Sequence, residues 1–261
     1  MGPTLSRRRA LTLLGASGIA AACSPDRPSF VGESPTGQRA VVEVTKPEFV
    51  PPPVPTTSPD DIDRSLVAQA TVDSIEVFES IDSAEPKLQL DNPIASGGPL
   101  VFLVDEVADE WVKVLLPVRP NGSIGYVRAD DITLSRHNYR IKVEIAETNL
   151  KILHRGELFF ETRVAVAAQN RPTPGGRYYL TELLQPPTPH SVYGTLAYGL
   201  SGFSEVLETF NGGPGQLGIH GTNDPDSIGQ SVSSGCVRMV NSDIDHIATF
   251  LPLGVPVEIF A

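Results

Sequence analysis

The chain of 261 residues is poor in cysteine and has no stripe of basic residues, and each shortage narrows what the protein can do. Only Cys23 and Cys236 occur, so a single disulfide is the most the chain could form, and it would need a long flexible arm folded back. The net charge of −11 and the lack of a basic stripe argue against nucleic acid as a partner. No group of His, Cys and carboxylate residues has the spacing of metal ligands, so no metal site is expected.

A long apolar run is also missing from the N-terminal segment "SRRRALTLLGASGIAAAC". Its apolar part is too short and too rich in Gly, Ser and Ala to span a membrane comfortably. The three arginines before it predict a signal peptide over residues 1–22, exported by the general secretory or the twin-arginine route. The run "IAAAC" resembles a bacterial lipobox, in which cleavage exposes a cysteine that carries lipid, although a plain secretory peptide also fits.

Residues 23–65 are expected to form a lipidated N-terminus and a linker rich in Pro, Ser, Thr and Asp. With lipid on Cys23, the protein would be extracytoplasmic, anchored to the outer face of the cytoplasmic membrane beside the cell wall. Cys236 would then have no disulfide partner. A lone thiol in an oxidising compartment is a liability unless it reacts usefully.

Residues 66–136 show a succession of short strand patterns that predict a small β-barrel. Asn121 and Gly122 predict a hairpin turn between the last two strands, because glycine accepts the positive φ of a tight turn. The region resembles bacterial SH3-like modules, which often accompany cell-wall enzymes, with Trp111 as a core anchor. The strand patterns are "TVDSIEVFES", "PLVFLVDEV", "WVKVLLPV" and "GYVRADDI".

Residues 137–261 predict a second, β-rich domain. Apolar and charged residues alternate from Tyr139 to Ile145, which indicates a half-buried strand, and a turn at Gly156 joins the next two strands. Behind Cys236, apolar residues at helical spacing predict one helix, with Ser242 and Asp245 in a start resembling a capping box. The fold class is therefore mainly β, with one helix after the cysteine.

Cys236 lies in the Ser/Gly turn "SSGCVRM", an unusual setting for an inert buried cysteine. A thiol near a helix start or a nest of backbone N–H groups has a lowered pKa and is a better nucleophile, but it still needs a base. Of the five histidines, His220 follows an apolar approach and opens a loop that returns to Cys236, as a Cys–His pair requires. The others are expected at the solvated surface: His137, His154, His190 and His246.

The segment "IHGTNDPDSIGQSVSSGCVRMVNSDI" resembles the signature of the L,D-transpeptidase catalytic domain, also called the YkuD domain. Further likeness covers "TPGGRYYL", "GLSGFSE" and the strands from Tyr139, so it extends over about half of the chain. Ser234 departs from the commonest pattern, because many members have a second histidine there.

The resemblance implies a role for each residue of the motif. Cys236 would be the nucleophile and His220 its base, with the Gly221 carbonyl orienting the imidazole. The backbone N–H groups of Gly235 and Cys236 would face the developing oxyanion. The substrate would lie against Ser233, Ser234 and Arg238, although Arg238 could equally brace the loop through a salt bridge.

The resemblance also implies a reaction that needs no cofactor. The cysteine would attack a peptidoglycan tetrapeptide stem, release D-Ala and pass the acyl group to an amine of a second stem, giving a 3→3 cross-link in cell-wall biogenesis. Carbapenem-type β-lactams are expected inhibitors. The alternatives are an L,D-carboxypeptidase that uses water as acceptor, a sortase-like thiol acyltransferase, and a non-catalytic cell-wall-binding protein.

Overall fold

The computed structural model describes residues 64–188, 191–209 and 213–261. The predicted signal peptide, Cys23, nearly all of the predicted linker and His190 lie outside the described residues. All described residues fall within one compact unit, Arg39–Ala261, and they are mainly β, as the sequence predicts. Within the described ranges, no helix has the length and the apolar character needed to cross a bilayer.

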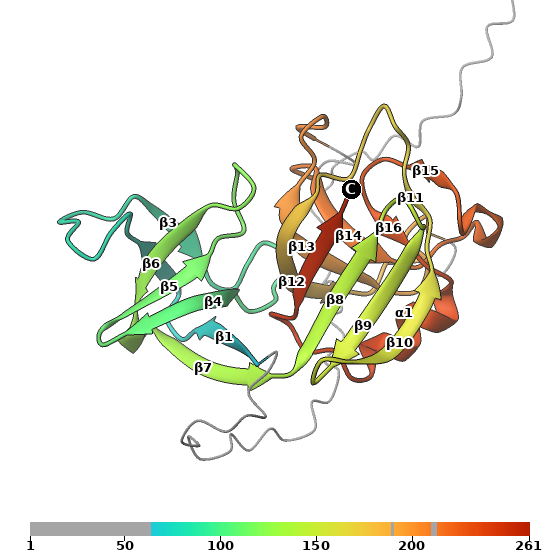
Figure 1. Cartoon of the computed structure of the whole chain (residues 1–261). Helices are drawn as coiled ribbons and strands as arrows, with labels where there is room; N and C mark the ends of the chain where they lie inside the picture. The colour runs from blue at the N-terminus through green and yellow to red at the C-terminus, as the bar shows by residue number, and fades with distance from the viewer. Residues whose placement is uncertain (1–63, 189–190, 210–212) are drawn as a thin grey trace, which may run out of the picture. The chain divides into compact units, whose positions relative to one another are not determined.

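The first part of the described chain forms an antiparallel five-stranded sheet in the order β6-β5-β4-β1-β7 (Figure 1). A hairpin of β2 (Ser74–Val77) and β3 (Leu88–Asp91) is tied to it by a bridge between Phe78 and Tyr126. The resemblance to SH3-like modules stays a prediction. The five strands are β1 (Ser65–Ala70), β4 (Val101–Ala108), β5 (Trp111–Leu115), β6 (Ile124–Arg128) and β7 (Ile132–His137).

Alternating apolar residues build the core of this first sheet. Val112 and Val114 of β5 and Val127 of β6 are fully buried, and Ile75 and Val77 of the hairpin join them. Trp111 does not anchor this core, contrary to the prediction, but is half-buried. It packs edge-on against the Phe78 ring at 5.0 Å, and the Arg128 guanidinium lies 4.6 Å from its ring centroid.

The loop between β5 and β6 has the hairpin turn that the Asn-Gly pair predicts. Leu116 N–H bonds to the Ser123 carbonyl at 2.8 Å, and Gly122 has a φ of +81°. The turn therefore presents Arg119 and Asn121 at the end of the hairpin, where both contact the second sheet.

The second sheet has eight strands in the order β10-β9-β8-β17-β12-β13-β14-β16. Its last strand in the chain, β17, lies in the middle, parallel to β8 and antiparallel to β12. The small parallel pair of β11 (Val166–Ala167) and β15 (Ser231–Ser233) lies outside this order. The eight strands are β8 (Tyr139–Glu144), β9 (Asn149–His154), β10 (Glu157–Arg163), β12 (Gly176–Leu184), β13 (Ala197–Phe203), β14 (Gln216–His220), β16 (Val237–Arg238) and β17 (Pro256–Phe260).

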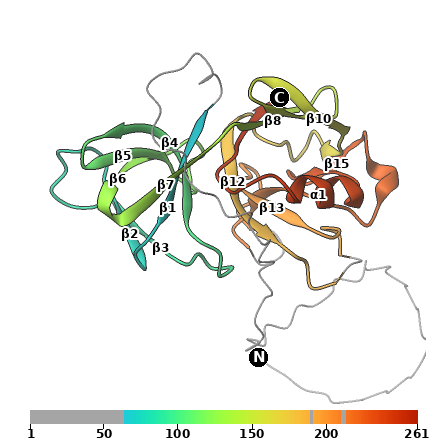
Figure 2. The ribbon, with the colours of Figure 1, turned by 90° about the horizontal axis from the view of Figure 1, so that it is seen from below.

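The α-helix of the described residues, α1 (Asn241–Ala248), lies against the curled second sheet (Figures 1 and 2). Ile244, Ile247 and Ala248 are buried in the sheet's core, which confirms the predicted apolar face. The capping box is wrong. The N-cap is Val240, which has no side-chain cap, and the Ser242 hydroxyl donates to the Asp243 carboxylate at 3.4 Å.

A third apolar cluster joins the two sheets. Its centre is Tyr179 of β12, which is fully buried and donates its hydroxyl to the Val101 carbonyl at 3.1 Å. An ion pair between Arg177 and Asp105 lies beside it, with an N–O distance of 2.6 Å. The other buried members of the cluster are Val67, Val101, Leu103 and Leu115, and the partly buried Leu253 packs against them.

Candidate active site

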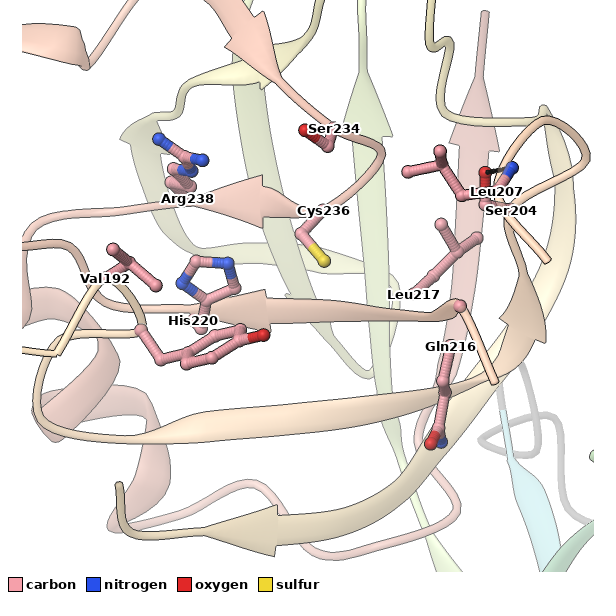
Figure 3. A pocket seen from close by; sticks show the side chains of 11 residues that line it. Val192, Ser204, Leu207, Gln216, Leu217, His220, Ser234, Cys236 and Arg238 are labelled. Carbon is pink, nitrogen blue, oxygen red and sulfur yellow. Dashed lines mark hydrogen bonds between the residues drawn. The ribbon is translucent and has the colours of Figure 1, made fainter. Parts of the chain in front are cut away.

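The candidate site is a small pocket at the edge of the second sheet, where β14 and β16 run parallel. His220 ends β14 and pairs with Arg238 of β16, while Cys236 lies directly before β16. Figure 3 shows the Cys236 sulfur beside the His220 imidazole. The pocket's volume is about 30 Å³, which is room for one or two waters. The sequence prediction that these two side chains meet agrees with their placement.

A short hydrogen bond orients His220. Its Nδ1 lies 2.6 Å from the Gly221 carbonyl oxygen. A carbonyl can only accept, so Nδ1 must carry the hydrogen and the neutral ring leaves its Nε2 lone pair free. The Gly221 carbonyl thus occupies the position that the sequence resemblance assigned to it.

Burial keeps the His220 ring neutral. The residue is only 4% exposed, and burial lowers its pKa from 6.5 to about 4. The bond to Gly221 opposes this change, and the nearby Arg238 cation adds to it. At neutral pH, the His220 imidazole is therefore uncharged and can accept a proton directly.

The Cys236 thiol is protonated at neutral pH, which corrects the expectation of a lowered pKa. Burial raises its pKa above 9.0, and this effect outweighs a backbone hydrogen bond from Gly218 and the positive charge of Arg238. The helix does not help, because α1 begins at Asn241, beyond β16. Cys236 is half-buried and has no disulfide partner among the described residues.

The loop that holds Cys236 depends on Gly235 and Ser233. Gly235 has a φ of +124°, a region that residues with a Cβ rarely adopt, and a Cβ there would lie 3.2 Å from Leu217 Cδ2. Its carbonyl accepts a 2.8 Å bond from the Thr173 hydroxyl, which comes from the "TPGGRYYL" stretch. Glycine is therefore required by the backbone conformation of the loop.

Ser233 does not face the pocket, contrary to the prediction that it binds substrate. Its side chain is fully buried, and its hydroxyl donates to the Cys236 carbonyl at 2.5 Å. The same oxygen accepts the Gly235 N–H at 3.3 Å, so this N–H is already engaged within the loop. Ser234, the next residue, does line the pocket.

Arg238 lines the pocket beside His220. Its Nε is buried and has no hydrogen-bond partner among the described residues. Of the two predicted roles, the arrangement favours binding of an anionic group over a salt bridge that braces the loop.

Sequence reasoning missed several residues of the site. Tyr193 packs edge-on against the His220 ring, with 5.0 Å between ring centroids. Asn241 accepts the Thr222 N–H at 2.9 Å and so holds the loop that follows His220. The stretch with Tyr193 lacks any periodic pattern, so its sequence carried no signal that could have found it. The remaining missed lining residues are Val192, Ser204, Leu207, Gly215, Gln216 and Leu217.

The other described histidines lie outside the pocket. His246 is exposed on α1, as expected, and His154 stacks on Tyr139 with 4.6 Å between ring centroids. His137 departs from the expectation of a solvated residue. Burial lowers its pKa to about 4 against a backbone hydrogen bond at Gly254.

Metal ligands do not gather in the described part of the chain. No cluster of three or more His, Cys, Asp or Glu side chains there is arranged to hold a metal ion.

Residues 138–259 match the family model of YkuD, the L,D-transpeptidase catalytic domain. The YkuD protein of Bacillus licheniformis is 35% identical over 121 residues, and that of Bacillus subtilis 33% over the same length. Each alignment covers 46% of this chain and 65% of the relative, so the chain spans less than two thirds of either relative. The structure of Bd1075 of Bdellovibrio bacteriovorus is 28% identical, covers 48% of both chains and has a TM-score of 0.39.

The family match begins at the start of β8, ends within β17 and includes Cys236, His220 and the loop between them. Residues 138–259 are therefore similar to the L,D-transpeptidase catalytic domain of the YkuD family.

Proposed function

We propose that this protein is a peptidoglycan L,D-transpeptidase that uses Cys236 as nucleophile and His220 as base. One observation carries the proposal: a cysteine and a neutral histidine line one pocket within a domain that matches this family. A thiol and a base in contact with one small cavity are what acyl transfer through a thioester requires.

The first half-reaction starts from a neutral pair. As the Cys236 sulfur bonds to the scissile carbonyl carbon, its proton passes to Nε2 of His220. The imidazolium that forms is stabilised by its Nδ1–H bond to the Gly221 carbonyl. When the tetrahedral intermediate collapses, the C–N bond to the terminal D-Ala breaks, and the proton on Nε2 passes to the leaving amine.

The second half-reaction transfers the acyl group. An amine of a neighbouring stem peptide attacks the thioester carbon and gives up a proton to His220. The C–S bond breaks, and Cys236 recovers its proton, which leaves a 3→3 cross-link. Water in place of the amine would give a tripeptide, so the choice of acceptor separates a transpeptidase from an L,D-carboxypeptidase.

Arg238 is the proposed site for a carboxylate of the donor stem. Its guanidinium reaches the pocket, and the carboxylate of the terminal D-Ala is the anion that the reaction brings there. The same cation opposes protonation of His220, so it favours the base form before substrate arrives. Ser234 lines the pocket as a further polar group for the stem peptide.

The oxyanion would be met by the N–H of Cys236. The Gly235 N–H, predicted to share this role, is bonded to the Ser233 hydroxyl and could turn to the substrate only if that 3.3 Å bond opened. A β-lactam of the carbapenem type would acylate the same thiol and compete with the stem peptide.

Incubation with purified disaccharide-tetrapeptide, followed by intact-mass analysis, tests the proposal. A transpeptidase gives a dimer lighter than two substrates by one D-Ala, and a carboxypeptidase gives the tripeptide monomer. Cys236→Ala should give neither product while it keeps the fold, because a small residue in a turn disturbs little packing. Product formation by this variant at the wild-type rate would overturn the assignment of the nucleophile.

The location in the cell is part of the proposal. We infer that export and lipidation at Cys23 anchor the protein to the outer face of the cytoplasmic membrane, within reach of the cell wall. The inference rests on the sequence of residues 6–23, which lie outside the described residues.

A further inference from the structure

Two side chains of the first sheet reach across to the pocket of the second. Arg119 and Asn121 lie in the loop between β5 and β6, and their hydrogen bonds end on main-chain atoms of residues 203–207 and of Pro214. We propose that these two residues are positioning residues for the donor peptide, which hold one wall of the Cys236 pocket in place. The proposal deepens the proposed function and rests on it for the identity of the substrate.

The wall that Arg119 and Asn121 hold is one side of the Cys236 pocket. Figure 3 shows Ser204, Leu207 and Leu217 on the side of Cys236 opposite to Val192 and Arg238. We call the pocket-lining residues of this side the far wall; they are Ser204, Leu207, Gly215, Gln216 and Leu217.

Arg119 binds three carbonyls, two of them in the far wall and the third in the residue directly before Gly215. It donates to the carbonyls of Ser204 at 2.6 Å, Leu207 at 3.2 Å and Pro214 at 3.0 Å. Its guanidinium also lies 5.0 Å from the centroid of the Phe203 ring. Because one planar fork binds three carbonyls, it fixes the two segments of the wall relative to each other.

Asn121 binds the backbone of Phe203 at two points. Its Nδ2 donates to the Phe203 carbonyl at 2.8 Å, and its Oδ1 accepts the Phe203 N–H at 2.8 Å. The side-chain amide thus pairs with the N–H and the C=O of one residue, as a residue of a neighbouring strand would. Both residues bind main-chain atoms, so they hold the position of the wall regardless of its side chains.

The fixed segments are connected to the nucleophile by direct contacts. Ser204 N–H bonds to the Gly215 carbonyl at 2.8 Å, and the Ser204 hydroxyl accepts the Leu207 N–H at 3.0 Å. Leu217 then packs on the backbone of Gly235, directly before Cys236. A shift of the far wall would therefore change the space next to the sulfur.

The chain is tightly packed at Gly215. Gly215 has a φ of +69°, and a Cβ there would lie 2.2 Å from the Leu207 carbonyl and 3.2 Å from Nη2 of Arg119. A contact that only joined the two sheets would not need such close packing. That function already falls to the apolar cluster around Tyr179 and to the Arg177–Asp105 ion pair.

The test compares Arg119→Ala, Asn121→Ala and a matched control, Arg128→Ala, in the full chain. Arg128 also stacks on an aromatic ring of the first sheet, 4.6 Å from Trp111, but it does not touch the far wall. With disaccharide-tetrapeptide as substrate, Arg119→Ala should raise KM about tenfold or more through the lost hydrogen bonds, with kcat within about twofold. Arg119→Lys should restore only part of the affinity, because one ammonium group cannot match the fork.

Hydrogen exchange supplies a readout that needs no substrate. The amides of Phe203, Leu207 and Leu217 should exchange about tenfold faster or more in Arg119→Ala, and at the wild-type rate in Arg128→Ala.

Wild-type KM together with wild-type exchange in both Arg119→Ala and Asn121→Ala would overturn the inference. So would a loss of protection spread evenly over the second sheet, which would indicate a general structural tie. If the wild-type protein forms no product from the tetrapeptide, the proposed function fails, and the exchange data alone still decide whether the two residues hold the wall.

Discussion

His220 and Cys236 both enter the reaction uncharged, and the reason lies in their surroundings at the scale of single residues. Burial lowers the pKa of the imidazole to about 4 and raises the pKa of the thiol. A preformed thiolate–imidazolium pair would need the opposite order of the two pKa values. Proton transfer is therefore part of the attack itself.

Alkylation kinetics at Cys236 test this order. Because only the thiolate reacts with iodoacetamide, the rate should rise about tenfold per pH unit from pH 6 to 9, without a plateau. His220→Gln should leave the shape of this profile unchanged, since no imidazolium stabilises the thiolate in the resting site. A plateau that begins near neutral pH would show a preformed ion pair and contradict the order of the pKa values.

At the scale of elements, the sequence pattern predicts the strands but not the conformation of the chain at their ends. Ile141 and Val143 alternate with charged residues, and this spacing alone places them inside. Ser233 and Ser234 look equivalent in the sequence, yet one is buried and the other lines the pocket. Which way each points depends on the φ of Gly235, and pattern reasoning does not supply that angle.

The start of α1 shows a second kind of error. Ser242 has the right neighbours for a capping box, but the helix begins two residues too early for its hydroxyl to cap. Val240 occupies the N-cap with an extended backbone, φ −63° and ψ 149°. The sequence contains the motif, but the residue at which the helix begins depends on the path of the chain after β16.

Val240→Thr should stabilise the protein for this reason. The change conserves shape and places a hydroxyl where the first N–H groups of α1 need an acceptor, so we expect a gain of about 0.5–1 kcal/mol. Urea denaturation of the two proteins measures the difference, with Val240→Ala as the control that lacks both hydroxyl and bulk. A threonine variant no more stable than wild type would show that these N–H groups are already satisfied.

At the scale of the whole molecule, the bonds of Arg119 and Asn121 could not be predicted. They join residues 82 to 95 positions apart in the chain, and the acceptors are main-chain groups that carry no sequence signature. The predicted pair of Cys236 and His220 was accessible because one local motif contains both. Contacts between sheets depend on how the strands pack, which alternation does not specify.

Acid stability belongs to this scale, because two histidines with lowered pKa values contribute to it. His137 and His220 have folded-state pKa values of about 4, below the unfolded value of 6.5. Between pH 6.5 and 4 the unfolded chain binds protons that the native protein excludes. The free energy of unfolding should therefore fall as pH drops through this window, by up to about 1.4 kcal/mol per pH unit for each histidine.

Urea titrations at pH 7, 6 and 5 measure this dependence. The slope of the unfolding free energy against pH gives the number of protons taken up on unfolding. His137→Gln should lower this number by about one between pH 6 and 5, and the exposed His246→Gln should not. A slope unchanged by His137→Gln would mean that this imidazole titrates alike in both states.

Membrane attachment is the last property to test at this scale. If Cys23 carries lipid, the wild-type protein should enter the detergent phase, and Cys23→Ser should move to the aqueous phase with Cys236 chemistry intact. Two or three acyl chains hold a protein firmly on a membrane, whereas one holds it only marginally. Wild-type protein wholly in the aqueous phase, with a mature N-terminus elsewhere, would leave simple secretion.

The central place of β17 has a consequence for the order of assembly. This strand follows every other strand in the chain, yet it pairs with β8 on one side and β12 on the other. Until it has been synthesised, β8–β10 and β12–β16 are two sheets with open edges, which lack the strand that joins them. A growing chain therefore cannot complete the domain, and the thiol and its base meet in a finished sheet only after Pro256–Phe260 has been made.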